Sequence, residues 1–539
     1  MEIQRQQALK ALRERSFDVL VIGGGATGAG IALDAQLRGL KVALVERFDF
    51  SSGTSSRSTK LVHGGVRYLE QAVLHLDRSQ FKLVREALSE RKILSEIAPH
   101  LVHWLPLLIP MYRRFGATYY HVGLRMYDWL AGKHLVHRSR VVSRQEALEL
   151  CPQLKKTGLK GGVIYYDGQF DDARMALSIL MTAAQEGAVL SNYVEAIGFE
   201  KSGGTLSGVK LRDALTSEEW STSARCVINA TGPYTDRIRA LDDPRCKPRL
   251  RVSSGTHLVL QRPNPGPQVG VLIPKTQDKR VLFVLPWLEH LVVGTTDADS
   301  KISDDPKPTP QEITFIQEEY QRYFEGDISN SAILSSWSGL RPLIQDSGTQ
   351  NTAALTRDHA LDESSSGLLS VFGGKWTTYR LMSQDTVNKI FNQLKRVSPP
   401  CRTHQFKLVG GGLGLAQARE VLKNSSLPKP TQEHLLRAYG DQSTGILDFL
   451  KNEGNELLHP HHPIILGEVD YCARKEFVSR SSDFLFRRSR LAFLDKKAAE
   501  ASFSKVHERL SQELQWTSTQ RRADQLDFSN QLNEKPLPG

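Results

Sequence analysis

Cysteine is scarce in this chain of 539 residues, which contains five. The five lie far apart, and no two have C-x-x-C or metal-finger spacing. This scarcity argues against a disulfide framework and against a zinc site, and we expect no metal centre. We predict reduced, mostly buried thiols in a reducing compartment, at Cys151, Cys226, Cys246, Cys401 and Cys472.

Long apolar runs are also missing. The chain has no stretch of about 18 apolar residues, the length that a spanning helix needs. The densest candidate, residues 101–112, is short and contains Pro106 and Pro110. Residues 1–16 lack an apolar signal core, so we expect a simple leading helix there rather than a secretion signal.

Acidic residues are fewer than basic ones. The chain has 59 Asp and Glu but 70 Lys and Arg, which gives a net charge of +11. Such a surplus suits nucleic acid, an anionic membrane surface or an acidic small substrate. We find no segment in which basic and aromatic residues alternate and no motif known to recognise nucleic acid, so we do not expect a nucleic-acid-binding protein. With 40% hydrophobic and 24% charged residues, the composition is that of a globular protein of two to four domains.

The N-terminal region carries a nucleotide-binding pattern. The apolar run FDVLVI, typical of a strand buried on both faces, is followed by Gly23, Gly25 and Gly28 in G-x-G-x-x-G spacing. A helical pattern and a second apolar run follow, ending at Glu46. In such a unit the glycines permit a tight turn and close approach of a pyrophosphate, and the acid binds ribose hydroxyls. The pattern predicts dinucleotide binding without deciding between FAD and NAD.

Later segments favour FAD. Residues 51–67 crowd hydroxyl groups and lead into a basic, glycine-hinged segment that could run along a diphosphate and a flavin ring. Two further apolar strands end in glycine turns, within 226–236 and 371–380, which is more dispersed than an NAD domain normally is. Beyond the first motif and Glu46, we therefore expect cofactor contacts from Thr54, Ser55, Ser58, Thr59, Lys60, Thr231, Gly232, Gly373, Gly374, Lys375 and Thr377.

Together these segments resemble the FAD-dependent glycerol-3-phosphate dehydrogenase family. The resemblance rests on IGGGATGAGIALDAQLRGLKVALVE, TSSRSTKLVHGGVRYLE, INATGPYTD, WSGLRPL and FGGKWTTYR, and runs from about residue 16 to 525. YYDGQFDDARM and RRSRLAFLDKKAAEASFSKV are similar to the long, mitochondrial-type branch. Animal members of that branch carry an EF-hand pair, but the tail here shows no D-x-[DN]-x-[DN]-G loop, so we do not expect calcium control.

The resemblance implies an α/β fold of the glycine/D-amino-acid oxidase type. It combines a Rossmann-like FAD-binding domain, an antiparallel-sheet substrate domain that roofs the flavin, and an α-helical C-terminal domain. We expect the FAD-binding domain in three segments, 1–76, 160–250 and 336–400. A helical, substrate-side insertion (77–159) and the strand-rich sheet domain (251–335) would separate these segments, and the C-terminal domain would span 401–539.

The family oxidises sn-glycerol 3-phosphate, and the resemblance carries residue roles with it. His257, in a Gly-x-His motif, is the preferred proton acceptor, because neutral imidazole titrates near working pH. Arg341 would hold the C2 oxygen, and His63 is a less favoured alternative base. A phosphate dianion needs several fixed cations, and the implied clamp consists of Arg67, Tyr68, Arg357 and Lys375.

The resemblance also implies a membrane quinone as electron acceptor. The protein would then be peripheral, on the cytoplasmic face of a bacterial inner membrane or on the mitochondrial inner membrane, and cytoplasmic if detached. The basic and apolar stretch 484–506 suits an anionic bilayer or, equally, packing on the cofactor domain. An oxidase that uses dioxygen and a related flavin amine oxidase stay open as alternatives, and the oligomeric state, a homodimer included, is undecided.

Overall fold

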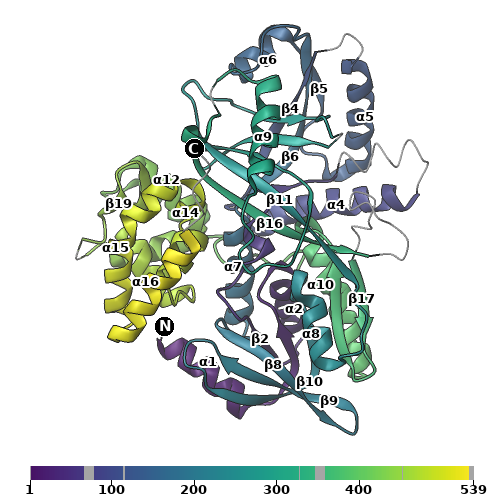
Figure 1. Ribbon diagram of the computed structural model, residues 1–539, viewed down its shortest axis with the longest axis vertical. Helices are drawn as coiled ribbons and strands as arrows, with labels where there is room; N and C mark the ends of the chain where they lie inside the picture. Colours follow the sequence, from purple (N-terminus) through teal and green to yellow (C-terminus); the bar gives the residue numbers. More distant parts are fainter. Residues whose placement is uncertain are drawn as a thin grey trace.

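The computed structural model describes residues 2–65, 78–112, 116–278, 280–326, 328–345, 359–451 and 453–532. Two large sheets lie one above the other in Figure 1, and a helical C-terminal domain packs at their side. This arrangement confirms the expected fold class.

The first sheet is the nucleotide-binding core. Its strands follow the order β17-β18-β10-β1-β2-β7, and β1 (Phe17–Ile22) pairs in parallel with β2 (Val42–Val45) and β10 (Glu219–Asn229). Apart from Asp18, the run FDVLVI is apolar because both faces of β1 are covered. The other strands are β7 (Val189–Ser191), β8 (Val194–Ser202), β9 (Thr205–Asp213), β17 (His359–Glu363) and β18 (Leu368–Gly373).

Alternate residues of β1 enter two different cores. Val19 and Val21 pack with the helices α2 (Ala26–Leu37), α7 (Asp172–Gln185) and α10 (Tyr379–Gln393). Leu20 and Ile22 pack on the opposite face with the leading helix and with β8 and β9. The expected leading helix is therefore confirmed as α1 (Glu2–Glu14), part of the fold's core.

The second sheet is larger than expected. Among the described residues it has ten strands, which come from four separate parts of the chain. Its strands are β3 (Leu61–Val62), β4 (Val102–Met111), β5 (Arg140–Ser143), β6 (Gly161–Phe170), β11 (Leu250–Gln261), β12 (Gly270–Ile273), β13 (Leu282–Trp287), β14 (His290–Gly294), β15 (Ala298–Ser300) and β16 (Ile333–Ile344). The helices α4 (Arg78–Ile97), α5 (Gly116–Ala131), α6 (Arg144–Leu150), α8 (Thr235–Asp242) and α9 (Pro310–Tyr323) connect the strands of the two sheets.

The observed strand pairing differs from the expected domain boundaries at two strands. We assigned 160–250 and 336–400 to the cofactor domain, but β6 pairs with β4 and most of β16 pairs with β11, so both belong to the second sheet. One pair, β12 with β4, is parallel, so the sheet is not wholly antiparallel. β3 directly follows the first cofactor-domain segment, β6 directly precedes the second, and the two strands pair with each other. The two sheets therefore meet where the Ser/Thr-rich loop, residues 51–60, ends.

The C-terminal domain is helical around its own apolar core. Among the residues that the structure describes, no helix is long and apolar enough to cross a membrane. The domain contains α11 (Leu415–Lys423), α12 (Lys429–Tyr439), α13 (Leu466–Lys475), α14 (Leu491–Leu494), α15 (Lys496–Glu513), α16 (Ser518–Leu532), the short strands β19 (Leu457–His459) and β20 (His462–Ile465), and a π-helical turn at Asp483–Arg488.

Candidate functional site

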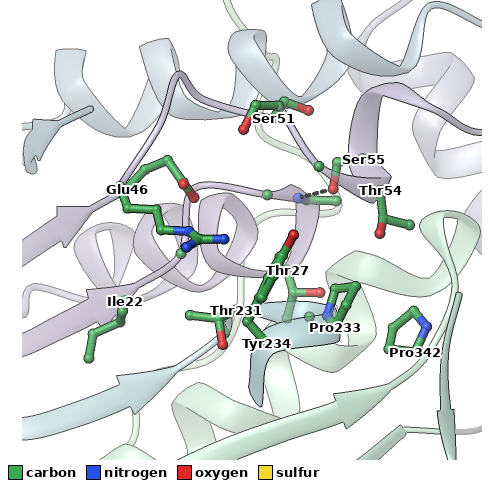
Figure 2. Close-up of a pocket in the computed structure, with 18 of the residues that line it drawn as sticks. Ile22, Thr27, Glu46, Ser51, Thr54, Ser55, Thr231, Pro233, Tyr234 and Pro342 are labelled. Carbon is green, nitrogen blue, oxygen red and sulfur yellow. Dashed lines mark hydrogen bonds between the residues drawn. The ribbon is translucent and has the colours of Figure 1, made fainter. Parts of the chain in front are cut away.

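A long pocket lies at the carboxyl ends of β1, β10 and β18, three adjacent parallel strands. The three glycine turns that follow these strands meet there, although about 350 residues separate the first from the last. Figure 2 shows Ile22, Glu46 and Thr231 among the residues that line the pocket, together with Thr54 and Ser55 of the hydroxyl-rich loop. Ten of the expected cofactor residues line the pocket: Gly23, Gly25, Glu46, Thr54, Ser55, Thr231, Gly232, Gly373, Gly374 and Lys375.

The first glycine turn leaves no room for side chains. A Cβ atom on Gly28 would lie 1.8 Å from the carbonyl oxygen of Gly23. Gly23 itself has φ +112°, and a Cβ there would lie 2.6 Å from the carbonyl oxygen of Ala230. Gly28 does not line the pocket. Glycine is needed at this position because α2 packs closely on the turn.

Glu46 stands at the end of β2, as the sequence predicts. Its carboxylate accepts hydrogen bonds from the backbone N–H groups of Gly24 (2.7 Å) and Phe48 (3.1 Å). Loss of water around the carboxylate raises its pKa above the usual value in spite of these bonds. The acid is thus fixed at the pocket wall, where it can accept hydrogen bonds from ribose hydroxyls.

Several residues of this pocket were not predicted. The guanidinium of Arg47 lies 4.4 Å from the ring centre of Phe48 and 4.5 Å from that of Tyr234, and pairs with Asp304. Arg47 directly follows Glu46, so its position in the sequence was a usable signal. Asp304 comes from the chain beyond β15, and no local pattern connects it to the pocket.

The third glycine turn, at Gly373 and Gly374, leads into residues that contact the Ser/Thr-rich loop and the segment directly after it. The indole N–H of Trp376 donates to the carbonyl oxygen of Ser55 (2.9 Å), and the N–H of His63 donates to the hydroxyl of Thr377 (3.2 Å). His63 and Thr377 therefore lie side by side, although neither lines the pocket itself. Trp376 was not predicted as a site residue, although it lies within the motif FGGKWTTYR.

Arg341 and His257 lie on the neighbouring strands β16 and β11 of the second sheet. The Arg341 guanidinium donates to the carbonyl oxygens of Ser254 (3.1 Å) and Thr296 (3.1 Å). Its chain neighbours reach the cofactor pocket, because Pro342 lines it and Leu340 accepts a hydrogen bond from Thr54 (2.6 Å). The second sheet thus brings a cation next to the end of the pocket.

His257 is buried, with 2% of its surface exposed. Its Nε2 is hydrogen-bonded to the hydroxyl of Thr59 (2.9 Å), and its ring stacks on Trp337 at 5.2 Å. Burial, and then the charges of Lys60 and Arg341, hold the pKa of His257 well below its ordinary value. The imidazole is therefore neutral at physiological pH, which is the state that a proton acceptor requires.

Comparison with known proteins decides the family. Residues 18–380 match the family described as FAD dependent oxidoreductase, and residues 401–521 match the C-terminal domain of alpha-glycerophosphate oxidase. The mitochondrial glycerol-3-phosphate dehydrogenase of Rattus norvegicus is 42% identical over 96% of this chain and 74% of its own length. The mitochondrial glycerol-3-phosphate dehydrogenase SDP6 of Arabidopsis thaliana is 42% identical over 97% of this chain and 86% of its own. The chain belongs to the FAD-dependent glycerol-3-phosphate dehydrogenase family.

A solved structure supports the same assignment. The glycerol-3-phosphate dehydrogenase from Bacillus halodurans, complexed with FAD, superimposes with a TM-score of 0.81 at 30% identity, covering 98% of this chain and 97% of that one. The cofactor of the family is FAD. The pocket fits FAD. Gly23 and Gly25, which have no side chains, leave room for a diphosphate at the N-terminus of α2, and Glu46 lies at the end of β2, where it can bind ribose hydroxyls.

Lys60 does not fit the cofactor contact that we predicted from its place in the motif. Its side chain is fully buried and turns away from the pocket, with its ammonium 2.8–2.9 Å from both carboxylate oxygens of Asp172. Ser58 also faces Asp172, through its backbone N–H (2.9 Å). Together with Thr59, which contacts His257, these residues form the wall behind the pocket.

Three residues of the phosphate clamp implied for the glycerol-3-phosphate dehydrogenase family lie outside the described residues. They are Arg67, Tyr68 and Arg357. The fourth, Lys375, lines the pocket at the third glycine turn.

The three arginines of the basic stretch 484–506 do not face solvent. Arg487, Arg488 and Arg490 are all buried, and the first two bind the carboxylate of Asp49 at 2.5–3.0 Å. Asp49 belongs to the loop that follows Glu46. Of the two interpretations of 484–506, packing on the cofactor domain therefore holds for these arginines, because their guanidinium groups pair with the loop that follows Glu46.

This buried pairing predicts a large loss of stability for Asp49→Asn. The variant leaves two buried guanidinium groups short of counter-charge, which typically costs about 3–5 kcal/mol. We expect a clearly lower thermal midpoint for the FAD-loaded protein. Asp299→Asn is the matched control, because Asp299 also takes a two-point contact from an arginine, Arg251, but is 58% exposed. Equal shifts for both variants would contradict the assignment.

Proposed function

We propose that this chain oxidises sn-glycerol 3-phosphate to dihydroxyacetone phosphate. The observation that carries the proposal is the convergence of three glycine turns on one pocket whose end adjoins Arg341, with a neutral His257 on the adjacent strand. Bound FAD supplies the electron sink for the hydride from C2. The chain's own residues bind the substrate, orient it and move its proton.

The proton and the developing charge fall to two residues. The neutral His257 takes the proton of the C2 hydroxyl, and the guanidinium of Arg341 stabilises negative charge on the C2 oxygen. The low pKa of His257 keeps it unprotonated and ready at neutral pH. His63 stays the alternative base, because it lies beside Thr377 at the third glycine turn.

The phosphate group of the substrate is held by Lys375 together with Arg67, Tyr68 and Arg357. A dianion bound by several cations fixes the distance from phosphate to C2, so that C2 lies against the cofactor. A flavin amine oxidase would need a carboxylate clamp instead, and activity with glycerol 3-phosphate against glycine separates the two functions.

The decisive experiment is an anaerobic titration of the purified protein with glycerol 3-phosphate. We expect the flavin absorbance to bleach with the phosphorylated substrate and to stay unchanged with glycine. Bleaching by glycine alone would turn the proposal toward an amine oxidase.

Loss of the clamp should act on binding. Arg357→Ala is expected to raise KM for glycerol 3-phosphate by about tenfold or more, with a smaller effect on kcat, because a charge-assisted contact to phosphate contributes about 1.5–3 kcal/mol. Arg245→Ala is the control, since its side chain is 92% exposed and pairs with Asp243 at the surface. A wild-type KM in Arg357→Ala would remove this residue from the clamp.

We infer further that a membrane quinone reoxidises the flavin and that the protein works at a membrane surface. The mitochondrial relatives and the net charge of +11 support this, since a basic surface is drawn to anionic lipid. A short-chain quinone should sustain turnover under nitrogen, and anionic vesicles should pellet the protein at low salt. Turnover with dioxygen alone would favour the oxidase, and no pelleting would remove the lipid claim.

A further inference from the structure

Three charged side chains are buried together behind the cofactor pocket. Lys60, Asp172 and Arg490 each expose 1% or less of their side chains. They come from the Ser/Thr-rich loop, the start of α7 and the segment before α14. The Asp172 carboxylate accepts from the Lys60 ammonium (2.8 and 2.9 Å) and from the Arg490 guanidinium (3.0 Å). We call these three residues the Lys60 cluster.

The cluster fixes the backbone on both sides of Thr59. Ser58 donates its N–H to Asp172 (2.9 Å), and the Lys60 ammonium and the Arg490 guanidinium both donate to the carbonyl oxygen of Ser56 (2.8 and 2.9 Å). Lys60 has a backbone φ of +64°, an uncommon conformation for a residue with a side chain. A local constraint of this kind determines which way the Thr59 hydroxyl points.

That hydroxyl is the hydrogen-bond partner of His257 Nε2, at 2.9 Å. The cluster reaches the same imidazole by a second route. The Lys60 ammonium lies 5.0 Å from the ring centre of Trp337, and Trp337 stacks on His257 at 5.2 Å with 18° between the ring planes. Lys60 therefore acts on His257 both through its chain neighbour and through a shared aromatic contact.

The charges around His257 come from few directions. Its neighbour on β14 is Gly294, which carries no charge, and β16 supplies Arg341 besides Trp337. The loop supplies Lys60, with Asp172 and Arg490 behind it, and Asp297 faces Arg341. The Lys60 ammonium and the Arg490 guanidinium face the carboxylate of Asp172, and that of Asp171 lies 3.6 Å from Arg490. Of these groups, the Lys60 ammonium is the one that disfavours an imidazolium at His257. Burial lowers the pKa of Lys60 to about 7, so its positive charge is complete only below neutral pH, which is where the acid limb lies.

We propose that Lys60 is a positioning residue for His257: clamped by Asp172 and Arg490, it orients Thr59 against the imidazole and places a positive charge beside it. This inference rests on the proposed function, because it assigns Lys60 a part in the proton step. It gives the C-terminal domain, through Arg490, a place in that step.

Lys60→Met tests the electrostatic part. The variant keeps the length of the side chain and leaves Asp172 paired one-to-one with Arg490, which also keeps its bond to Ser56. Removal of the cation favours the imidazolium, so the acid limb of the flavin-reduction rate should move to higher pH by about half a unit or more. Lys505→Met is the control, since Lys505 pairs with Glu456 at the surface and is 44% exposed.

A purely structural role predicts another pattern, in which the rate falls equally at every pH and the acid limb stays in place. Such a result in a FAD-loaded Lys60→Met would overturn the electrostatic part. Titration of 15N-labelled histidine rings by NMR gives a readout apart from turnover. The His257 signal is assigned by its absence from the spectrum of His257→Gln. The pKa of His257 read from this signal should be higher in Lys60→Met than in the wild type.

Thr59 tests the positioning part without disturbing buried charge, and it decides the case if Lys60→Met does not fold. Thr59→Val has the same shape but lacks the hydroxyl, and we expect about tenfold slower flavin reduction at unchanged FAD content. Thr59→Ser keeps the hydroxyl and should recover most of the rate. A wild-type rate in Thr59→Val would overturn the inference.

The outcomes also separate this inference from the proposed function. If glycerol 3-phosphate does not bleach the wild-type flavin, the proposed function fails. If it does and the Lys60 and Thr59 variants behave as wild type, only the present inference fails.

Discussion

Replacing His257 with glutamine is expected to lower kcat for glycerol 3-phosphate about a hundredfold or more. Glutamine keeps a polar group near Thr59 and Trp337 but cannot take a proton, and loss of a general base typically costs 10²–10⁴-fold. The flavin content and the thermal midpoint should change little, because the position is filled by a side chain of similar reach. Stopped-flow flavin reduction measures the effect directly, since it does not depend on the electron acceptor.

Two matched variants make this result interpretable. His461→Gln replaces an exposed histidine of the C-terminal domain and should leave the rate unchanged. His63→Gln tests the alternative base. If His63→Gln loses the rate while His257→Gln keeps it, the roles of the two histidines must be exchanged.

Replacing Gly28 with alanine is expected to abolish FAD binding. The added methyl group would lie 1.8 Å from the carbonyl oxygen of Gly23, and this contact is with backbone, which cannot rotate away. The turn or the first residues of α2 must then shift, and the cradle around Gly23 and Gly25 is lost with them. Purified Gly28→Ala should be colourless, with less than about a tenth of the wild-type flavin content.

Gly123→Ala is the control for this variant. Gly123 lies in α5, and a Cβ there meets no atom within 4 Å of the described structure. Alanine favours a helix over glycine by up to about 1 kcal/mol, so this variant should be yellow and at least as stable as the wild type. A yellow Gly28→Ala would show that the turn can relax, and the close-packing argument would fall.

The cofactor pocket could be predicted because each of its turns carries a local signature. A strand that ends in glycine is visible at Ile22, at Asn229 and at Phe372, and parallel strands of one sheet bring such ends to the same edge. Glu46 follows from its place at the end of the second strand. The membership of β6 and β16 in the second sheet could not be predicted, because an apolar strand pattern does not say which neighbour the strand will choose.

The buried charges were the hardest feature to predict. For Arg487 and Arg488 the sequence leaves contact with a bilayer and packing on the cofactor domain equally open, because charged side chains are usually exposed. Their partner Asp49 is 438 and 439 positions away, and no local pattern joins them. The contact of Lys60 was also not predictable. Its motif lies in the loop beside the cofactor pocket, but its own side chain binds Asp172. Pairing over such distances is decided by the tertiary fold alone.

The bond between Asp49 and Arg488 has a consequence for how the protein is made. The guanidinium groups that neutralise the loop after Glu46 are synthesised 438 and 439 residues after Asp49. Until residues 483–490 have emerged, Asp49 lacks its counter-ions and the loop lacks its permanent support. We therefore expect firm capture of the flavin only after these residues have emerged, and a chain that stops at residue 400 should retain the flavin less well.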